Sequence, residues 1–125
     1  MKKILFASLI GVISITSAYA KCDGGTEVTN TAGTTFCKSN RDINWWSAAA
    51  WCKENALHLA TMYEMCPNWN GNTGSGKCPE LKGIAAATFV WSATASGSNN
   101  AFGVHIMEGS VTTYERTSSL YAFCR

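Results

Sequence analysis

The apolar positions between residues 44 and 55 repeat with the period of an α-helix. One stripe of the expected helix, at i, i+3, i+4 and i+7, consists of Trp45, Ala48, Ala49 and Cys52. Asn44 is a favourable N-cap residue, and Asn55 can adopt the left-handed conformation that ends a helix. We therefore expect a helix that begins at Asn44 and ends at Asn55.

A short strand and a second short helix are indicated directly afterwards. Apolar residues alternate over residues 57–60, as they do in a short buried strand. Thr61 and Glu64 have the spacing of a capping box, so the second helix should begin at Thr61. This helix must be short, because Pro67 follows closely and a proline does not continue a helix.

From Phe89 onward the apolar pattern changes to a period of two, which is typical of strands. We expect strands over residues 89–94, 101–107, 110–114 and 120–125, joined by turns rich in Gly, Ser and Asn. Residues 21–38, rich in Thr, Gly and Asn, predict a hairpin. The fold class is then α+β, with two short helices packed on an antiparallel sheet that ends in a meander.

The first twenty residues have the three parts of a secretory signal peptide. Lys2 and Lys3 precede an apolar run over residues 4–15, and Ala18 and Ala20 supply the small residues of a cleavage site. We expect residues 1–20 to be a signal peptide and residues 21–125 to be one domain, secreted or periplasmic and bacterial. An uncleaved membrane anchor is the alternative, but the apolar run is short for a membrane span.

Charge excludes two classes of partner once the signal peptide is removed. Two of the ten Lys and Arg residues lie in it, so the remaining eight balance the eight Asp and Glu residues. No basic stripe is left to bind nucleic acid, and no polybasic segment is left to bind anionic lipid. We therefore expect neither a nucleic-acid partner nor membrane insertion after cleavage.

All six cysteines lie in the expected domain: Cys22, Cys37, Cys52, Cys66, Cys78 and Cys124. An even number of cysteines in a small exported chain predicts a disulfide framework. Structural zinc is not expected, because there is no C-x-x-C motif and the two histidines, His58 and His105, are far apart in sequence. Six cysteines allow fifteen pairings, and their spacing does not choose among them.

Two segments carry a resemblance to a known family. The run Trp45-x-x-Ala48-x-x-x-Cys52, followed by Asn55-Ala56-Leu57-His58-Leu59-Ala60 and Glu64, resembles the first helix and second strand of C-type lectin-like domains. The later run Val90-Trp91-Ser92-Ala93-Thr94 and the ending Tyr121-Ala122-Phe123-Cys124-Arg125 resemble exported bacterial relatives of that fold. The resemblance implies Cys52–Cys124 and Cys22–Cys37 bridges, which leaves Cys66 and Cys78 to pair locally.

The motifs for calcium-dependent sugar binding in that family are missing. They are a Glu-Pro-Asn or Gln-Pro-Asp run and a Trp-Asn-Asp run, and neither occurs in this chain. Calcium also needs clustered oxygen ligands, whereas the carboxylates beyond Cys66 are widely separated. We expect no metal, no cofactor and no catalytic residue. Both histidines fall in predicted strands, every cysteine has a possible partner, and an unrecognised enzyme is the least favoured hypothesis.

Two polar loops, residues 68–77 and 96–100, are the expected binding elements, because binding residues concentrate on loops. The candidate ligand-binding residues are Trp69, Asn70, Asn72, Asn99 and Asn100. Trp69 could instead fold back onto the core, which we favour, and Trp46 and Trp51 either pack under the hairpin or form an exposed patch. The sequence predicts a non-catalytic binding module that recognises a protein or glycan on a surface without calcium. The alternative is a structural or accessory subunit of an exported envelope or pilus assembly.

Overall fold

The computed structural model describes residues 21–84 and 87–125, so the predicted signal peptide lies outside the described residues. The elements in chain order are β1 (Gly25–Thr29), β2 (Thr35–Ile43), α2 (Trp45–Glu54), α3 (Met62–Met65), the 3-10 helix η1 (Pro79–Leu81), β3 (Phe89–Ala95), β4 (Asn100–His105), β5 (Ser110–Glu115) and β6 (Leu120–Cys124). The mixed α+β class is confirmed, and no helix in this part of the chain is long and apolar enough to cross a bilayer.

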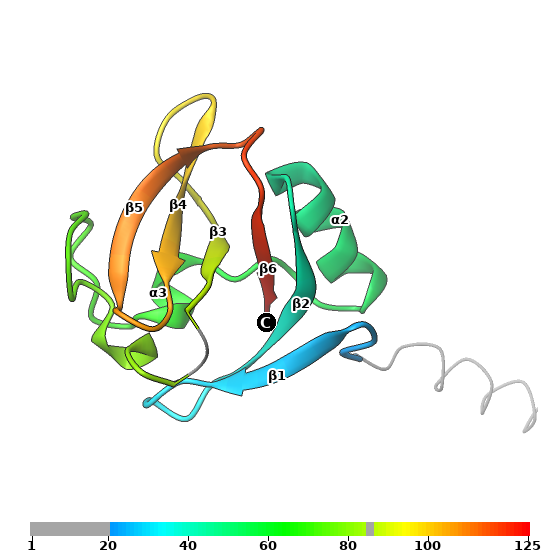
Figure 1. Ribbon diagram of the computed structural model, residues 1–125, viewed down its shortest axis with the longest axis horizontal. Helices are drawn as coiled ribbons and strands as arrows, with labels where there is room; N and C mark the ends of the chain where they lie inside the picture. Colours follow the sequence, from blue (N-terminus) through cyan, green and yellow to red (C-terminus); the bar gives the residue numbers. More distant parts are fainter. Residues whose placement is uncertain (1–20, 85–86) are drawn as a thin grey trace, which may run out of the picture.

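One six-stranded sheet has the order β1-β2-β6-β3-β4-β5 (Figure 1). The predicted antiparallel meander is correct for β3, β4 and β5, but it is wrong for β6. This last strand lies between β2 and β3 and runs parallel to β3. Ala122, Phe123 and Cys124 are fully buried, as expected for a central strand covered on both faces. An edge position beside β5 would leave these side chains partly exposed.

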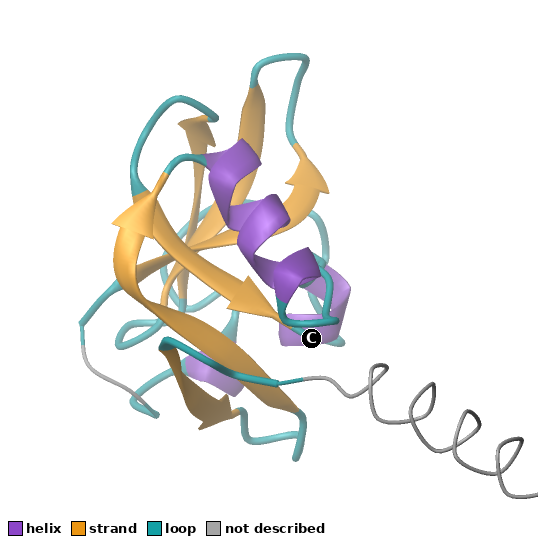
Figure 2. Ribbon diagram, turned by 90° about the vertical axis from the view of Figure 1, so that its right-hand side faces the viewer, coloured by secondary structure: helices purple, strands orange, loops and turns teal. Residues whose placement is uncertain are grey.

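Helix α2 lies across one face of the sheet and packs mainly against β6 (Figure 2). Its N-cap is confirmed, because the Asn44 side chain accepts a hydrogen bond from the Ser47 N–H at 2.9 Å. The expected left-handed residue is wrong by one position, since Ala56 has a φ of 58° and Asn55 does not. The Asn55 amide is held in place by two bonds, donating to the Trp51 carbonyl and accepting from the Asp23 N–H.

The second predicted helix is confirmed as the single turn α3. Thr61 and Glu64 form both hydrogen bonds of the capping box. The strand expected over residues 57–60 is reduced to an isolated bridge between Leu59 and Cys124. The backbone of Ala60 bonds to two different strands. Its N–H donates to the Phe123 carbonyl of β6, and its carbonyl accepts from the Ala93 N–H of β3, so no ladder continues along either strand.

The structure has three disulfides, Cys22–Cys37, Cys52–Cys124 and Cys66–Cys78. The first two are those that the family resemblance implies, and the third is the remaining local pair. The second bridge joins α2 to the central strand β6, and the first joins the chain ahead of β1 to β2. Trp91 is fully buried between these elements, and its indole N–H donates to the Ile43 carbonyl at 2.8 Å. Helix, hairpin and sheet are therefore linked covalently, which is typical of proteins in oxidising compartments.

Candidate functional site

The five ligand-binding residues predicted from sequence fall on two separate surfaces. The loop over residues 68–77 pairs with the start of β5 through Gly74 and Val111. Asn100 pairs with Glu115 at the other end of the same strand. Four residues of an extended strand span about 13 Å. The structure therefore separates Asn70 and Asn72 from Asn99 and Asn100, and their role in binding stays a prediction.

Trp69 folds back onto the core rather than into solvent, which is the favoured one of its two predicted placements. Only 7% of its surface is exposed, and its ring packs against Phe102 with centroids 4.8 Å apart. Its indole N–H donates to the Asn72 carbonyl at 2.8 Å. The loop is thus closed around Trp69, and this side chain stabilises the loop from inside.

A concave surface lies instead between α2 and β2, and we call it the α2–β2 groove. It has a volume of about 570 Å³. Its walls are formed by Asn40, Arg41 and Ile43 of β2 and by Ser47, Ala50, Trp51 and Glu54 of α2. Such a volume is within the usual range for small-molecule sites. Small side chains on the helix wall leave this space open beside the larger Trp51.

An irregularity in β2 shapes the strand wall of the groove. Between Lys38 and Asp42, β2 has three residues where the facing part of β6 has only Ala122. The hydroxyl of Ser39 repairs the interrupted ladder, accepting from the Ala122 N–H at 2.9 Å and donating to the Arg41 carbonyl at 2.8 Å. Bulges of this kind redirect side chains. Here Asn40 and Arg41 are the residues presented to the groove.

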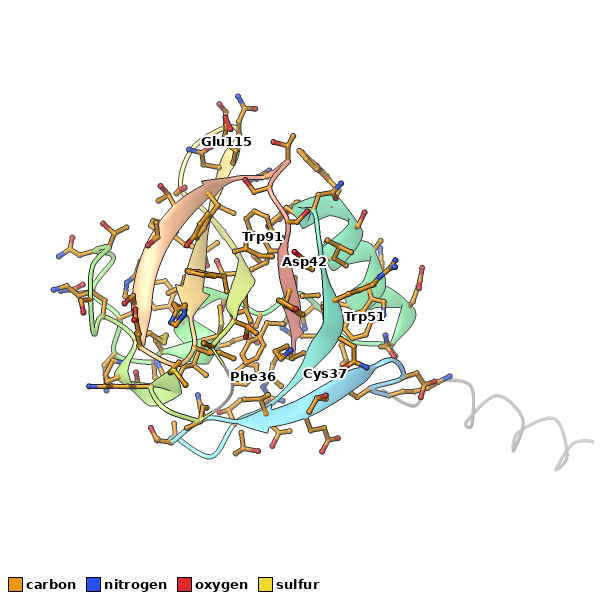
Figure 3. The ribbon with its side chains drawn as sticks, in the orientation of Figure 1. Phe36, Cys37, Asp42, Trp51, Trp91 and Glu115 are labelled. Atoms are coloured by element: carbon orange, nitrogen blue, oxygen red, sulfur yellow. A yellow bond between two sulfur atoms is a disulfide. The ribbon has the colours of Figure 1, made fainter. Side chains whose placement is uncertain are left out.

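The ring of Trp51 extends from α2 toward β2 (Figure 3) and reaches under the start of β1. A Cβ atom placed on Gly25 would lie only 2.9 Å from Trp51 Cη2 and 2.6 Å from the Lys38 carbonyl oxygen. Only glycine fits at this position without a shift of the ring or backbone. Trp51 is half-buried, so it forms an apolar platform in the groove while its edge is clamped by the hairpin.

The polar groups of the groove are largely uncommitted. Within residues 21–84 and 87–125, the side chains of Arg41 and Glu54 have neither an ion pair nor a hydrogen bond, and both are exposed. The side-chain oxygen Oδ1 of Asn40 accepts from the Thr26 hydroxyl at 3.2 Å, which orients the side-chain amide. One cation, one anion and one amide are thus available around an aromatic platform.

Lys38 supports this wall from behind. Its ammonium donates to the Ser39 carbonyl at 3.2 Å and lies 4.2 Å from the centre of the Tyr121 ring. Burial lowers the pKa of Lys38 from its ordinary value. Through the Ser39 carbonyl the ammonium contributes to holding the bulge in place, on the face of the sheet that carries Tyr121 of β6.

A histidine–carboxylate pair also lies on the surface, outside the groove. His58 Nε2 is 2.8 Å and 3.0 Å from the two oxygens of Glu64. Glu64 also accepts from the Thr61 N–H and hydroxyl at 2.9 Å and 3.3 Å, so it lies between Thr61 and His58. In a catalytic triad the histidine lies between the nucleophile and the carboxylate. Here the carboxylate of Glu64 lies between the Thr61 hydroxyl and His58, and it closes the capping box of α3.

Metal ligands gather at one point in the described part of the chain, at Cys66, Cys78 and Glu80. Both sulfur atoms are joined in a disulfide, so neither is a thiolate that could bind a metal. The exposed carboxylates do not form another such cluster among these residues. The groove itself offers side-chain hydrogen bonds, two charges and an aromatic face.

Sequence reasoning considered Trp51 but missed the rest of this groove. A usable signal was present in α2, where Ser47, Ala50, Trp51 and Glu54 form a second stripe at i, i+3, i+4 and i+7. This stripe is polar or small apart from one tryptophan, which is unusual for a core face. Asn40 and Arg41 carry no such signal, because their direction depends on the bulge.

For Trp46 and Trp51 the sequence left two alternatives open, packing under the hairpin or exposure on the surface. Trp51 packs under the hairpin, whereas Trp46 is 52% exposed and contacts Trp45 edge to face.

No protein-family model and no curated protein matches this chain. The functional argument therefore depends on the geometry of the chain itself.

Proposed function

We propose that this protein is a non-catalytic binding module that recognises a surface ligand, a protein or a glycan, without calcium. The observation that carries the proposal is the α2–β2 groove, where Arg41 and Glu54 have no partner among the described residues and lie beside the half-buried Trp51. Concave sites that combine an aromatic platform with a few oriented polar groups are typical of ligand binding.

The scaffold around the groove supports the same proposal. Cys22–Cys37 fixes the hairpin beside Trp51, and Cys52–Cys124 fixes α2 to the sheet. Both walls of the groove are therefore held in place before a ligand arrives. Such preorganisation lowers the entropic cost of binding.

Location and family belong to the same proposal. The three disulfides favour a secreted or periplasmic protein. A bridge from the first helix of the domain to its last strand supports a C-type lectin-like fold, since the resemblance implies this pairing. The order of helices before the C-terminal strands also agrees with that assignment.

The test is a screen of the oxidised protein, residues 21–125, on glycan and peptide arrays with and without EDTA. We expect binding that survives EDTA and is lost in the double variant Arg41→Ala/Glu54→Ala. The matched control is Lys82→Ala/Glu115→Ala, which also removes one exposed cation and one exposed anion. Binding that requires calcium, or that is lost equally in both double variants, would contradict the proposal.

The second candidate function is a structural or accessory subunit of an exported assembly. One specific observation favours it: β1 is an edge strand with exposed Thr26, Glu27 and Thr29, whereas Gly74 bonds the outer edge of β5 in both directions. An open strand edge can pair with another chain. Native mass spectrometry separates the two functions, because a binding module stays monomeric and a subunit self-associates.

A further inference from the structure

We infer that the α2–β2 groove binds a zwitterionic ligand, with its ammonium group against Trp51 and Glu54 and its anionic group on Arg41. This inference rests on the proposed function and names the chemistry of its ligand. The two charges are on opposite walls, Arg41 on β2 and Glu54 on α2, and line the same space.

The helix wall has the composition of a site for an ammonium group. Trp51 and Glu54 are three residues apart on α2, so they share one face of the helix, and both line the groove. Tryptophan is the best aromatic partner for a cation, and quaternary ammonium ligands bind in this way. Ser47 and Ala50 are too small to cover the ring.

Among residues 21–84 and 87–125, Arg41 on the facing strand is the one cation that lines the groove with Glu54. Lys53 is the nearest in sequence, but it lines a different groove on the other flank of α2, together with Trp45 and Ala49. Arg41 has no ion pair with a described carboxylate, so it does not neutralise Glu54. The negative charge beside Trp51 is therefore available to a ligand.

The strand wall has the composition of a site for an anion. Arg41 presents a planar fork of N–H donors that matches carboxylate and phosphate groups. Arg41 and Ile43 both line the groove, whereas Asp42, which pairs with Tyr121 of β6, does not line it. The side-chain oxygen of Asn40 is already bonded to Thr26, which leaves the two N–H groups of its side-chain amide as further donors.

Opposite charges in one groove favour a zwitterion over other ligand classes. A polyanion is repelled by Glu54, and a polycation is repelled by Arg41. A neutral ligand would cover both charges without pairing either of them, which is costly. A zwitterion pairs both, and a groove of about 570 Å³ accommodates a small one.

Phosphocholine is a suitable probe, because it joins a quaternary ammonium group to a phosphate. We expect isothermal titration to detect phosphocholine binding, with choline alone and inorganic phosphate alone each binding at least about tenfold more weakly. Glu54→Gln and Arg41→Met should each weaken phosphocholine binding by about tenfold or more. Lys53→Met and Glu115→Gln are the matched controls and should leave the affinity unchanged. All four side chains are exposed, so these variants should fold.

Two sources of this headgroup are then separated with vesicles of phosphatidylcholine. Sedimentation with vesicles that depends on Glu54 and Arg41 assigns the site to a lipid headgroup. Binding of free phosphocholine without sedimentation assigns it to a soluble or glycan-borne form. Absence of phosphocholine binding, or binding that is equal in Glu54→Gln, Arg41→Met and the controls, overturns the inference.

The same experiment distinguishes this inference from the proposed function. Suppose that an array ligand protects the groove from hydrogen exchange but phosphocholine does not bind. The inference of a zwitterionic ligand is then wrong, and the proposed binding module is supported. If no array ligand protects residues 40–54 and phosphocholine does not bind, both fail.

Discussion

Replacing Ser39 with alanine is the sharpest test of how the fold builds the groove. The Ser39 hydroxyl makes two hydrogen bonds, one from the Ala122 N–H at 2.9 Å and one to the Arg41 carbonyl at 2.8 Å. Ser39 is 3% exposed and Ala122 is fully buried. Ser39→Ala therefore leaves a buried amide of the central strand β6 without its partner.

The expected cost is about 1–3 kcal/mol of unfolding free energy, which is the usual penalty for an unsatisfied buried donor. For a domain of this size, each kcal/mol lowers the melting temperature by about 4–8 °C. Urea unfolding of the oxidised protein measures the free energy, and hydrogen exchange reports on the Ala122 amide directly. Affinity at the groove should fall as well, because Ser39→Ala releases the backbone of Arg41.

Ser119→Ala is the matched control, since Ser119 is exposed and its hydroxyl makes no hydrogen bond within the described residues. Its unfolding free energy should stay within about 0.5 kcal/mol of that of the unchanged protein. The reasoning is refuted if Ser39→Ala behaves like Ser119→Ala and the Ala122 amide keeps its protection. In that case the bulge does not depend on the hydroxyl.

Three further predictions follow from the same structure. Gly25→Ala should shift Trp51 and lower the unfolding midpoint. Gly97→Ala is the control, because a Cβ there meets nothing within 4 Å, and it should leave the midpoint unchanged. Equal midpoints for the two variants would contradict the close packing of Gly25 on Trp51. Burial raises the pKa of Glu64, but hydrogen bonds from the Thr61 N–H and from His58 outweigh it and hold the pKa below its ordinary value. The folded-state pKa is thus depressed, so this stabilisation is present above the unfolded-state pKa and is lost as pH falls through the folded-state pKa. Acid titration of unfolding should show that loss, and Glu64→Gln should abolish it. EDTA should leave the melting temperature unchanged, and a fall of several degrees would reveal a stabilising metal site.

Local signals in the sequence were sufficient for the helices. Asn44 and the Thr61–Glu64 pair act within a few residues of their own helix, so their hydrogen bonds could be inferred from spacing. The end of α2 was harder to predict, because the Asn55 amide bonds to Asp23, far away in the chain. The left-handed residue is Ala56, one position after this bonded asparagine.

The place of β6 in the sheet is not a local property. The alternation in residues 120–124 predicts a strand, but period-two alternation does not say which strands lie beside it. A continuous meander is the simplest connection, since consecutive strands usually pair. The Cys52–Cys124 bridge was the one signal for a different partner, and it came from the family resemblance rather than from periodicity.

The groove could be predicted only in half, for a related reason. Its helix wall is a stripe at fixed spacing and is visible in the sequence, whereas its strand wall exists because three residues of β2 face one residue of β6. That mismatch is possible only once β6 lies beside β2, so an error in strand order conceals the site. Ser39 connects the two levels, because one buried hydroxyl both completes the sheet and directs Asn40 and Arg41 toward Trp51. Ser39 thus contributes to the fold and to the candidate site at once, so a change there should alter stability and binding together.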